Sequence, residues 1–558
     1  MVKEESVIFS TRKQFKLWLW CTLIFAFIRT IPMLADFPIA HITLSFIKKV
    51  LLIGAILCLA LFVWNKTNFR KYLENNNSSR RSIRPSVILT LFLGLILILW
   101  LPPYLALYPG TFGADAPIQE AMFRGLYPWS DHHPILHTLV LGAFIQFGIT
   151  VFDSATVGLG FYTFIAQLLF CAVAVASSST YLYRKKVPLW IITVMVIGLC
   201  INPYVQVLVC YSTKDIPFAA AFLLFIVNVC YILFPPKLSE NKASFYKKRA
   251  IITCLLGFLA VQLRSQGLYI IMVAIIVLLF YFRKNLNQKI IRLFFVCQVT
   301  VLITSVVFNM FVPIVLGSER RDSREALAVP IQQMSAALTE NENAVSPFLD
   351  EELTGNIKNY FDGYDAVMYN KYVADVPKSI FKTNIVNEDP LKFVQTYIET
   401  ICANPSLAIR SYVNLVKPYF DFTQTPYNNL VIETSFEDLN SDLNITHKSL
   451  FPTYEQYLTS AIRLTNFNEC PLFLKLFDFS WVLYLLGFLL GVAVVYKSKL
   501  SLICFLYPFL YIGTMFLGPM ALLRYAFIYV LQWPFYGGCI WISLFSKNNA
   551  KDKVNFTD

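Results

Sequence analysis

Residues 86–107 read SVILTLFLGLILILWLPPYLAL, a run without a charged side chain. An α-helix rises about 1.5 Å per residue, so a run of this length crosses the roughly 30 Å of hydrocarbon in a lipid bilayer. Similar runs recur along the chain, in which 57% of the 558 residues are hydrophobic and only 15% are charged. Since a water-soluble surface does not tolerate this balance, the sequence predicts an all-α polytopic membrane protein.

The apolar runs predict about 12 or 13 transmembrane segments. The runs that are long enough to cross, or nearly so, are 17–34, 45–64, 86–107, 134–151, 158–182, 189–209, 216–234, 250–263, 268–282, 291–316, 479–496, 500–517 and 525–544. Lys and Arg cluster in short loops between these runs, and the positive-inside rule assigns such loops to the cytoplasm. We therefore expect a multi-pass protein of the cell membrane whose N-terminus is cytoplasmic.

This orientation predicts a second set of loops on the extracytoplasmic side. These are residues 108–133, 212–215, 264–267, 317–478 and the turn before Arg524. One conflict arises, because two full crossings between His133 and Arg184 would put the basic residues 184–186 outside as well. Either one of the two intervening segments only dips into the membrane, or this basic cluster breaks the rule.

The segment 317–478 differs from the rest of the chain in its charge. It has 22 acidic against 13 basic residues, and it is long enough to fold alone as an extracytoplasmic domain, α-rich or α+β. We expect it to separate an N-terminal membrane domain (1–316) from C-terminal transmembrane helices (479–545) and a cytoplasmic tail (546–558). It contains two cysteines, Cys402 and Cys470, and a disulfide between them is one possibility.

The net charge of +13 does not indicate a nucleic-acid partner, because the basic residues lie in short loops beside the bilayer. The sequence contains neither a Gly-x-x-x-x-Gly-Lys-Ser/Thr motif nor a strand-linked Gly-x-Gly-x-x-Gly motif. An ATP-driven pump and a nucleotide-sugar enzyme with a Rossmann domain are therefore unsupported.

Two polar stretches in the loop 108–133 and just after it are the first candidates for function. The sequence Tyr-Pro-Gly-Thr-Phe-Gly-Ala-Asp spans 108–115, and Asp131, His132, His133 and His137 follow around Pro134. An ionisable cluster at a membrane boundary is a functional candidate by default. The alternative is an ordinary polar loop followed by a helix that starts at the proline.

Further candidates lie in the other predicted outer loops. Asp215 follows Lys214 at a helix start, where it could instead be a helix N-cap or part of a solvated pair. Arg264 and the Arg524-Tyr525 pair stand at ends of apolar runs, where an arginine can grip a lipid phosphate through two hydrogen bonds. Interfacial snorkelling is the alternative for both arginines.

An acidic residue in the first large outer loop, followed about twenty residues later by a His-Pro entry into the next helix, resembles the GT-C superfamily of polytopic glycosyltransferases. Protein O-mannosyltransferases and lipid A aminoarabinose transferases are nearest in pattern. The resemblance implies that Asp115 is the catalytic base, that Asp215 is a second catalytic carboxylate and that Arg264, Arg524 and Tyr525 hold the donor phosphate. The chain also resembles a family of multi-spanning proteins from Gram-positive bacteria that carries the Tyr-Pro-Gly and Asp-His-His-Pro signatures.

The implied reaction transfers a sugar from a polyprenyl-phosphate donor to a cell-wall polymer, a glycolipid or a protein. No cofactor is expected. The chain departs from the GT-C pattern by having a lone Asp115, which weakens a metal-dependent mechanism. It also has extra histidines, and these leave open a divalent cation shared by His133, His137 and Asp131. A transporter of lipid-linked saccharides would place charges mid-membrane in paired halves, and a non-enzymatic envelope scaffold would not need Asp115.

Overall fold

A computed structural model describes residues 11–66, 83–113, 115–236, 242–320, 322–345, 347–365, 368–420, 442–463 and 478–545. Arg321, Cys470 and the tail 546–558 lie outside the described residues, as does most of the basic segment between the second and third apolar runs. The possibility of a Cys402–Cys470 disulfide is therefore untested. Cys402 itself is exposed.

The first part of the chain is a succession of helices. They are α1 (Thr11–Thr30), the 3-10 helix η1 (Ile31–Ala35), α2 (Ile39–Lys66), α4 (Pro85–Ala106), α5 (Ala116–Phe123), α6 (Ile135–Phe152), α7 (Ala155–Phe161), the π-helix η2 (Tyr162–Leu169), α8 (Phe170–Arg184), α9 (Leu189–Cys200), α10 (Pro203–Leu208), α11 (Asp215–Leu233), α12 (Lys242–Leu263), α13 (Gln266–Phe282), the 3-10 helix η3 (Arg283–Asn285) and α14 (Lys289–Val315).

The segment after α14 forms a smaller helical domain, and apolar helices then resume. The elements are η4 (Ser323–Ala326), α15 (Ala328–Asn343), α16 (Glu351–Lys358), α17 (Asp375–Ser379), α18 (Thr383–Glu388), α19 (Pro390–Ala403), α20 (Pro405–Val416) and η6 (Lys417–Tyr419), then α21 (Pro452–Arg463), α23 (Trp481–Val495), α24 (Lys499–Met515), α25 (Leu523–Leu531) and α26 (Trp533–Phe545). We call residues 317–420 the inserted domain.

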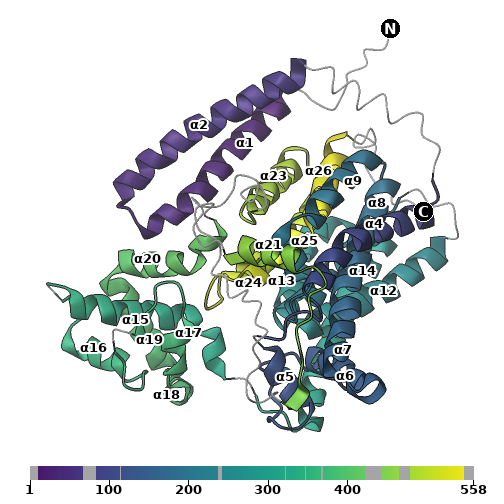
Figure 1. Ribbon diagram of the computed structural model, residues 1–558. Coiled ribbons are helices and arrows are strands. Elements are labelled where there is room, and N and C mark those ends of the chain that lie inside the picture. The colour runs from purple at the N-terminus through teal and green to yellow at the C-terminus, as the bar shows by residue number, and fades with distance from the viewer. Residues whose placement is uncertain are drawn as a thin grey trace.

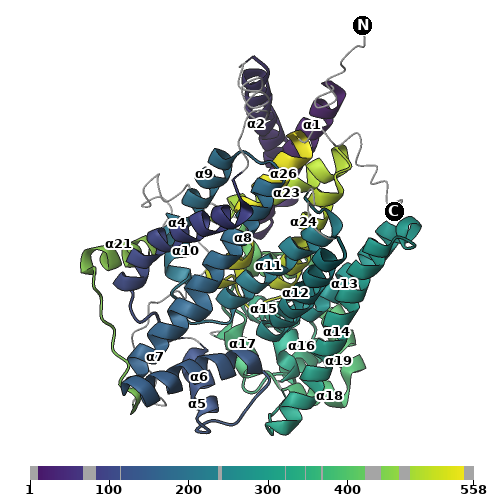
Figure 2. The same cartoon turned by 90° about the vertical axis from the view of Figure 1, so that its right-hand side faces the viewer.

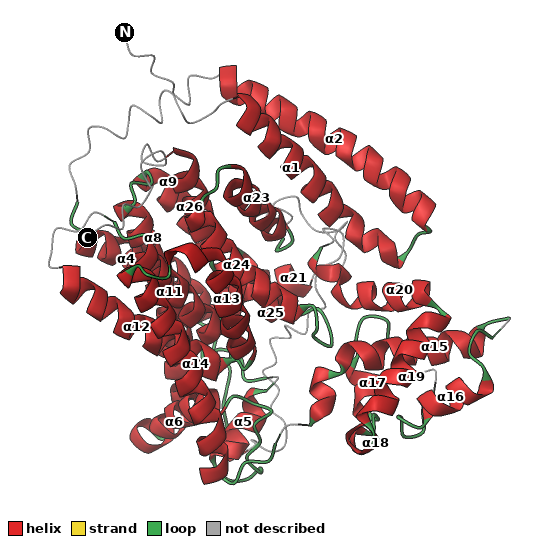
Figure 3. Cartoon of the chain, turned by 180° about the vertical axis from the view of Figure 1, so that it is seen from behind, coloured by secondary structure: helices red, strands yellow, loops and turns green. Residues whose placement is uncertain are grey.

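The prediction of an all-α polytopic membrane protein is confirmed. Within the described residues, nine helical segments are long and apolar enough to cross a membrane, and α9, α23 and α24 are shorter apolar helices. The same part of the chain contains isolated β-bridges but no longer strand (Figure 3). The inserted domain, as far as it is described, is α-rich and has a small apolar core of its own around Met334, Phe361 and Phe381.

The main bundle is built around α11, all of whose residues are buried. It packs against α8, α12 and α25, while the α1–α2 hairpin stands to one side and the inserted domain lies at the lower left in Figure 1. Residues 442–463 do not join the inserted domain. Leu443 and Ile445 instead pack with Phe112 and Tyr162 of the membrane part.

The conflict over the basic residues 184–186 has a structural answer. Gln167 of η2 donates a hydrogen bond to the carbonyl of Tyr211 (2.8 Å), just before α11 begins. Tyr181 of α8 donates to the carbonyl of Phe234 (3.1 Å), just after α11 ends. The chain therefore runs from one end of the bundle to the other within α8, and α6 and α7 form a hairpin at the first end (Figure 2). This geometry favours the alternative in which one of the two segments does not cross.

Two predicted runs are broken rather than continuous. The run 189–209 divides into α9 and α10, because the side chain of Asn202 caps α10 by accepting a hydrogen bond from the N–H of Tyr204 (3.0 Å). The run 525–544 divides into α25 and α26 at Gln532. Both breaks replace one long helix by two shorter ones, which apolar composition alone does not reveal.

Candidate functional site

The candidate site begins with an ion pair between two loops. Asp115 lies directly before α5, and its Oδ2 accepts a hydrogen bond from Nζ of Lys214 at 2.9 Å. Lys214 lies directly before α11. Both side chains are partly exposed, 23% for Asp115 and 17% for Lys214, so a ligand can reach them.

Backbone contacts explain why these loops meet. The N–H of Thr111 donates to the carbonyl of Cys210 (3.0 Å), and the N–H of Ser212 donates to Oγ1 of Thr111 (3.2 Å). The preceding residue, Gly110, has a φ of +107°, and a Cβ there would overlap the side chain of Thr163 and lie 2.9 Å from the carbonyl oxygen of Cys210. Glycine is therefore required at this point of the Tyr-Pro-Gly stretch.

Asp215, the second predicted carboxylate, is fully buried and paired with two arginines. Its Oδ1 accepts a hydrogen bond from Nη1 of Arg264, and its Oδ2 lies 3.8 Å from Nε of Arg524. The hydroxyl of Thr213 also lies 3.3 Å from Oδ2. The side chain makes no capping hydrogen bond and is not solvated, so Asp215 is neither a helix N-cap nor part of a solvated pair with Lys214.

Arg524 joins the two carboxylates into one cluster. Its Nη1 lies 3.5 Å from Oδ2 of Asp115, on the same oxygen that Lys214 contacts. Three positive side chains (Lys214, Arg264 and Arg524) and two carboxylates (Asp115 and Asp215) therefore meet, and their formal charges sum to +1. We call these five residues the ion cluster.

Neither arginine of the ion cluster is a snorkelling side chain. The side chains of Arg264 and Arg524 are only 8% and 15% exposed. The ring of Tyr525 lies 4.6 Å from the guanidinium carbon of Arg264 and 5.3 Å from that of Arg524, which is within range of cation–π attraction. Tyr525 thus contacts both cations that were predicted to hold a phosphate.

His133 lies at the edge of the ion cluster. Its Nδ1 is 3.9 Å from Oδ2 of Asp115, too far for a hydrogen bond, and this buried nitrogen has no hydrogen-bond partner among the described residues. Burial, with the positive charge of Lys214 next, lowers the pKa of His133 to about 3. The ring is therefore neutral near pH 7.

Opposing influences act on the pKa of Asp115. Burial acts to raise its pKa, but Lys214, Arg524 and His133 lower it, so that the pKa lies well below its usual range. The carboxylate is thus ionised at all physiological pH values, and it is a weak base as long as both cations remain in contact with it.

His137 belongs to a different hydrogen-bond chain. Its Nδ1 lies 3.0 Å from Oε1 of Gln119, and its Nε2 lies 2.6 Å from the hydroxyl of Tyr162, which Gln167 approaches in turn at 3.4 Å. With both ring nitrogens engaged, His137 is not placed to share a cation with His133. Within the described residues, no group of three His, Cys, Asp or Glu side chains is arranged to hold a metal ion.

Gln119, Tyr162 and Gln167 are site residues that the sequence did not predict. A buried amide in an otherwise apolar run, such as Gln167 in 158–182, is a signal that could have been used. Asp131 and His132 lie outside the ion cluster. The N–H of Asp131 donates to the carbonyl of Glu319 (3.0 Å), which joins their loop to the start of the inserted domain.

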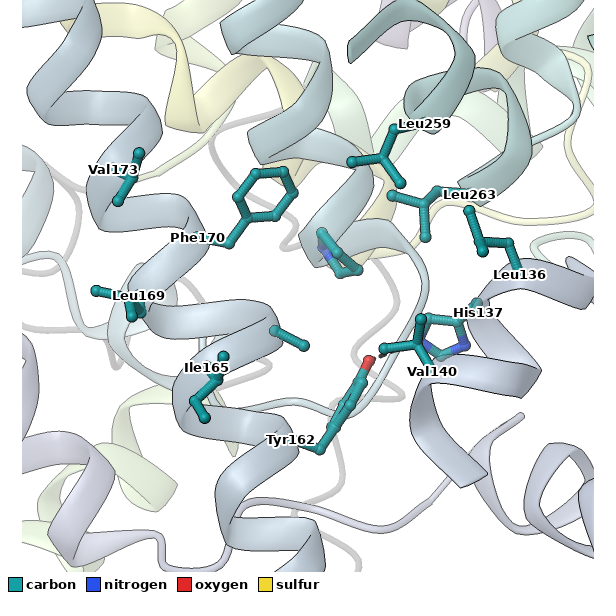
Figure 4. A pocket seen from close by; sticks show the side chains of 12 residues that line it. Leu136, His137, Val140, Tyr162, Ile165, Leu169, Phe170, Val173, Leu259 and Leu263 are labelled. Carbon is teal, nitrogen blue, oxygen red and sulfur yellow. Dashed lines mark hydrogen bonds between the residues drawn. The ribbon is translucent and has the colours of Figure 1, made fainter. Parts of the chain in front are cut away.

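An apolar cavity of about 330 Å³ lies beside the ion cluster. Side chains of α6, η2, α8, α11 and α12 line it, among them Val140, Ile165 and Phe170 (Figure 4). Two lining residues connect it to the ion cluster, since Leu263 immediately precedes Arg264 and Pro217 stands two positions after Asp215.

The inserted domain also reaches the site. The N–H of Ala374 donates to the carbonyl of Pro519 (2.8 Å), and Tyr372 and Tyr525 pack in one small apolar cluster. The hydroxyl of Tyr419 accepts a hydrogen bond from the N–H of Leu522 (3.0 Å), just before α25. These contacts hold the start of the helix that carries Arg524.

A model of a protein family described as a family of unknown function (DUF6020) matches residues 126–554. The match includes four of the five ion-cluster residues, whereas Asp115 precedes it. No curated protein and no solved structure matches the chain.

Proposed function

The chain belongs to the DUF6020 family, and we propose that it is a membrane glycosyltransferase that transfers a sugar from a polyprenyl-phosphate donor to an extracytoplasmic acceptor of the cell envelope. The acceptor is a cell-wall polymer, a glycolipid or a protein. The observation that carries the proposal is the position of the ion cluster, which combines an accessible carboxylate with three cations beside an apolar cavity.

The chemistry required of such a site supports the proposal. A hydroxyl oxygen of the acceptor attacks the anomeric carbon, the bond from that carbon to the phosphate oxygen breaks, and the phosphate leaves with the bonding electrons. Asp115 takes the hydroxyl proton, and the configuration inverts. Arg264, Arg524 and Tyr525 would hold the phosphate, because guanidinium groups bind phosphate oxygens through paired hydrogen bonds.

The arrangement of charge favours this activity over transport of a lipid-linked saccharide. A transporter is expected to carry ionisable groups near mid-membrane, where they bind the coupling ion or substrate. The residues of the ion cluster lie instead at helix ends, next to the starts of α5, α11 and α25 and the end of α12. The neighbouring cavity is lined by apolar side chains, which suits part of a polyprenyl chain.

The test is a chemical analysis of envelope glycans. A strain that lacks the gene is complemented with the wild-type chain, with Asp115→Asn or with Asp131→Asn, and membrane abundance of each protein is measured. We expect deletion to remove a specific sugar, the wild type and Asp131→Asn to restore it, and Asp115→Asn to fail at normal abundance. Full restoration by Asp115→Asn would show that this carboxylate is not the base, and the transporter or scaffold reading would then replace the transferase.

A further inference from the structure

Asp115 places one carboxylate oxygen between two cations. Lys214 and Arg524 both approach one oxygen, Oδ2, at 2.9 and 3.5 Å. Lys214 lies directly before α11 and Arg524 lies in α25, and the carboxylate between them is still 23% exposed. A phosphate oxygen that enters the site would compete with Oδ2 for the same two donors.

The two arginines of the ion cluster differ in how firmly they are held. Arg264 donates a hydrogen bond from Nη1 to Asp215, and its Nε donates to Oε1 of Gln266 at 3.1 Å. Arg524 lies 3.5 Å from Asp115, 3.8 Å from Asp215 and 3.5 Å from the hydroxyl of Thr213. None of these three contacts is as short as an optimal charge-assisted hydrogen bond of about 2.7–2.9 Å. A phosphate oxygen could therefore approach Arg524 more closely than either carboxylate does, while Tyr525 stays in contact with the guanidinium.

We propose that Asp115 is a resident anion of a phosphate site, and that a phosphate ester displaces it by taking over Lys214 and Arg524. The released carboxylate then faces the acceptor hydroxyl. This inference rests on the proposed function for the identity of the donor, but not for the binding of phosphate. Donor binding thereby makes Asp115 a stronger base, and without a donor the carboxylate stays paired with Lys214 and Arg524.

The charge of the ion cluster fits this exchange. Its formal charge of +1 is neutralised by a phosphodiester, such as a sugar linked to a lipid phosphate, which carries one negative charge. The charged or titratable groups nearest to Asp115 are Lys214, Arg524 and His133, from the starts of three different helices, and His132 and His137 act on it as well. Once the two cations have moved to phosphate, the influence that holds the pKa of Asp115 low is reduced, and the carboxylate becomes a stronger base.

The experiment measures binding of farnesyl phosphate to the purified full-length protein in detergent by isothermal titration calorimetry. Removing a resident anion should strengthen phosphate binding, so we expect the Kd to fall by at least about fivefold in Asp115→Asn. Asp131→Asn, a nearby carboxylate outside the ion cluster, should leave the Kd unchanged. Arg524→Gln should weaken binding by about tenfold or more, because it removes a ligand of the phosphate.

The proposal is overturned if folded Asp115→Asn binds farnesyl phosphate no more tightly than the wild type, or if Asp131→Asn strengthens binding equally. Asp115→Ser serves as a second charge-removing variant where Asp115→Asn fails to fold. The binding measurement is independent of turnover. If Asp115→Asn binds farnesyl phosphate more tightly but restores the envelope sugar, the phosphate site is supported and the transferase is contradicted. If Asp115→Asn fails to restore the sugar but binds no more tightly, the transferase is supported and the phosphate site is contradicted.

Discussion

Nζ of Lys214 lies 2.9 Å from Oδ2 of Asp115, although the two residues are 99 positions apart in the sequence. Two loops that follow and precede different helices, α4 and α11, bring them together, and the backbone hydrogen bond from Thr111 to Cys210 fixes the approach. The pair links the only carboxylate of the ion cluster that is accessible with the cation closest to it. Its strength therefore governs the basicity of Asp115.

Removing the charge of Lys214 should expose this dependence. Burial acts to raise the pKa of Asp115, and Lys214 is the largest influence that lowers it, so the pKa should rise toward its ordinary range in Lys214→Gln. Asp115 must be ionised to accept a proton, and kcat/KM reports the protein without bound donor, in which Lys214 still contacts Asp115. The kcat/KM for sugar transfer should therefore begin to fall at a higher pH in Lys214→Gln than in the wild type, as measured between pH 3 and 7.

Lys214→Arg is the matched control for this variant, because it keeps the positive charge. Its acid limb should coincide with that of the wild type. Identical pH profiles for the wild type and Lys214→Gln would contradict the assignment of Lys214 as the residue that sets the basicity of Asp115.

Asp215 should matter for stability in a way that exposed ion pairs do not. Asp215→Asn leaves Arg264 and Arg524 buried without their carboxylate, and breaking such a pair costs about 3–5 kcal/mol of unfolding free energy. The comparison is Glu342→Gln, which breaks an ion pair to Lys358 whose side chains are 38% and 45% exposed, and which should cost less than about 1 kcal/mol. Denaturant unfolding in detergent measures both. Equal effects would show that the buried pair is not a stabilising element.

The class of fold could be predicted from the sequence because hydrophobic length is a local property. Each predicted apolar run proved to be mostly helical where it is described, since a spanning segment must satisfy its backbone hydrogen bonds internally. The break at Asn202 was not predictable in the same way. An asparagine followed by proline can cap a helix inside an apolar run, and only the three-dimensional path shows that the chain turns there.

The candidate site was predictable as a set of residues but not as a network. Asp115 and Asp215 are predicted because acidic residues in the outer loops are functional candidates, and Arg264 and Arg524 because an arginine at the end of an apolar run can hold a lipid phosphate. Which carboxylate pairs with which cation depends on long-range packing, and sequence spacing carries no such information. His133 and His137 illustrate the limit, because their spacing suggested a shared cation while the fold engages His137 with Gln119 and Tyr162 instead.

Gly110 should be intolerant of any side chain. In Gly110→Ala, the new Cβ meets the side chain of Thr163 and the carbonyl of Cys210, and a φ of +107° is unfavourable for alanine. Overpacking of this kind costs about 1–3 kcal/mol. Gly355→Ala is the control, because a Cβ there meets nothing within 4 Å, and alanine in a helix is favoured over glycine by up to about 1 kcal/mol. Thermal unfolding should show a lower Tm for the first variant and an unchanged or higher Tm for the second.

His133 should make the protein sensitive to mild acid. Burial, together with Lys214, lowers the pKa of His133 to about 3, whereas a histidine in the unfolded chain titrates near 6.5. Below pH 6.5 the ring binds a proton in the unfolded state but not in the folded state. The free energy of unfolding therefore falls by up to about 1.4 kcal/mol for each unit by which the pH is lowered. At pH 5 the cost from this residue amounts to about 2 kcal/mol, and it is absent in His133→Gln.

The measurement is the change in Tm between pH 7 and pH 5 for the wild type, for His133→Gln and for His41→Gln, which replaces an exposed histidine of α2. His133→Gln should lose less stability on acidification than the wild type, because its side chain takes up no proton when the chain unfolds. His41→Gln should follow the wild type. If Tm falls by the same amount in all three proteins, the folded state protonates His133 as readily as the unfolded state does. The pKa of His133 is then not lowered by its burial and by Lys214.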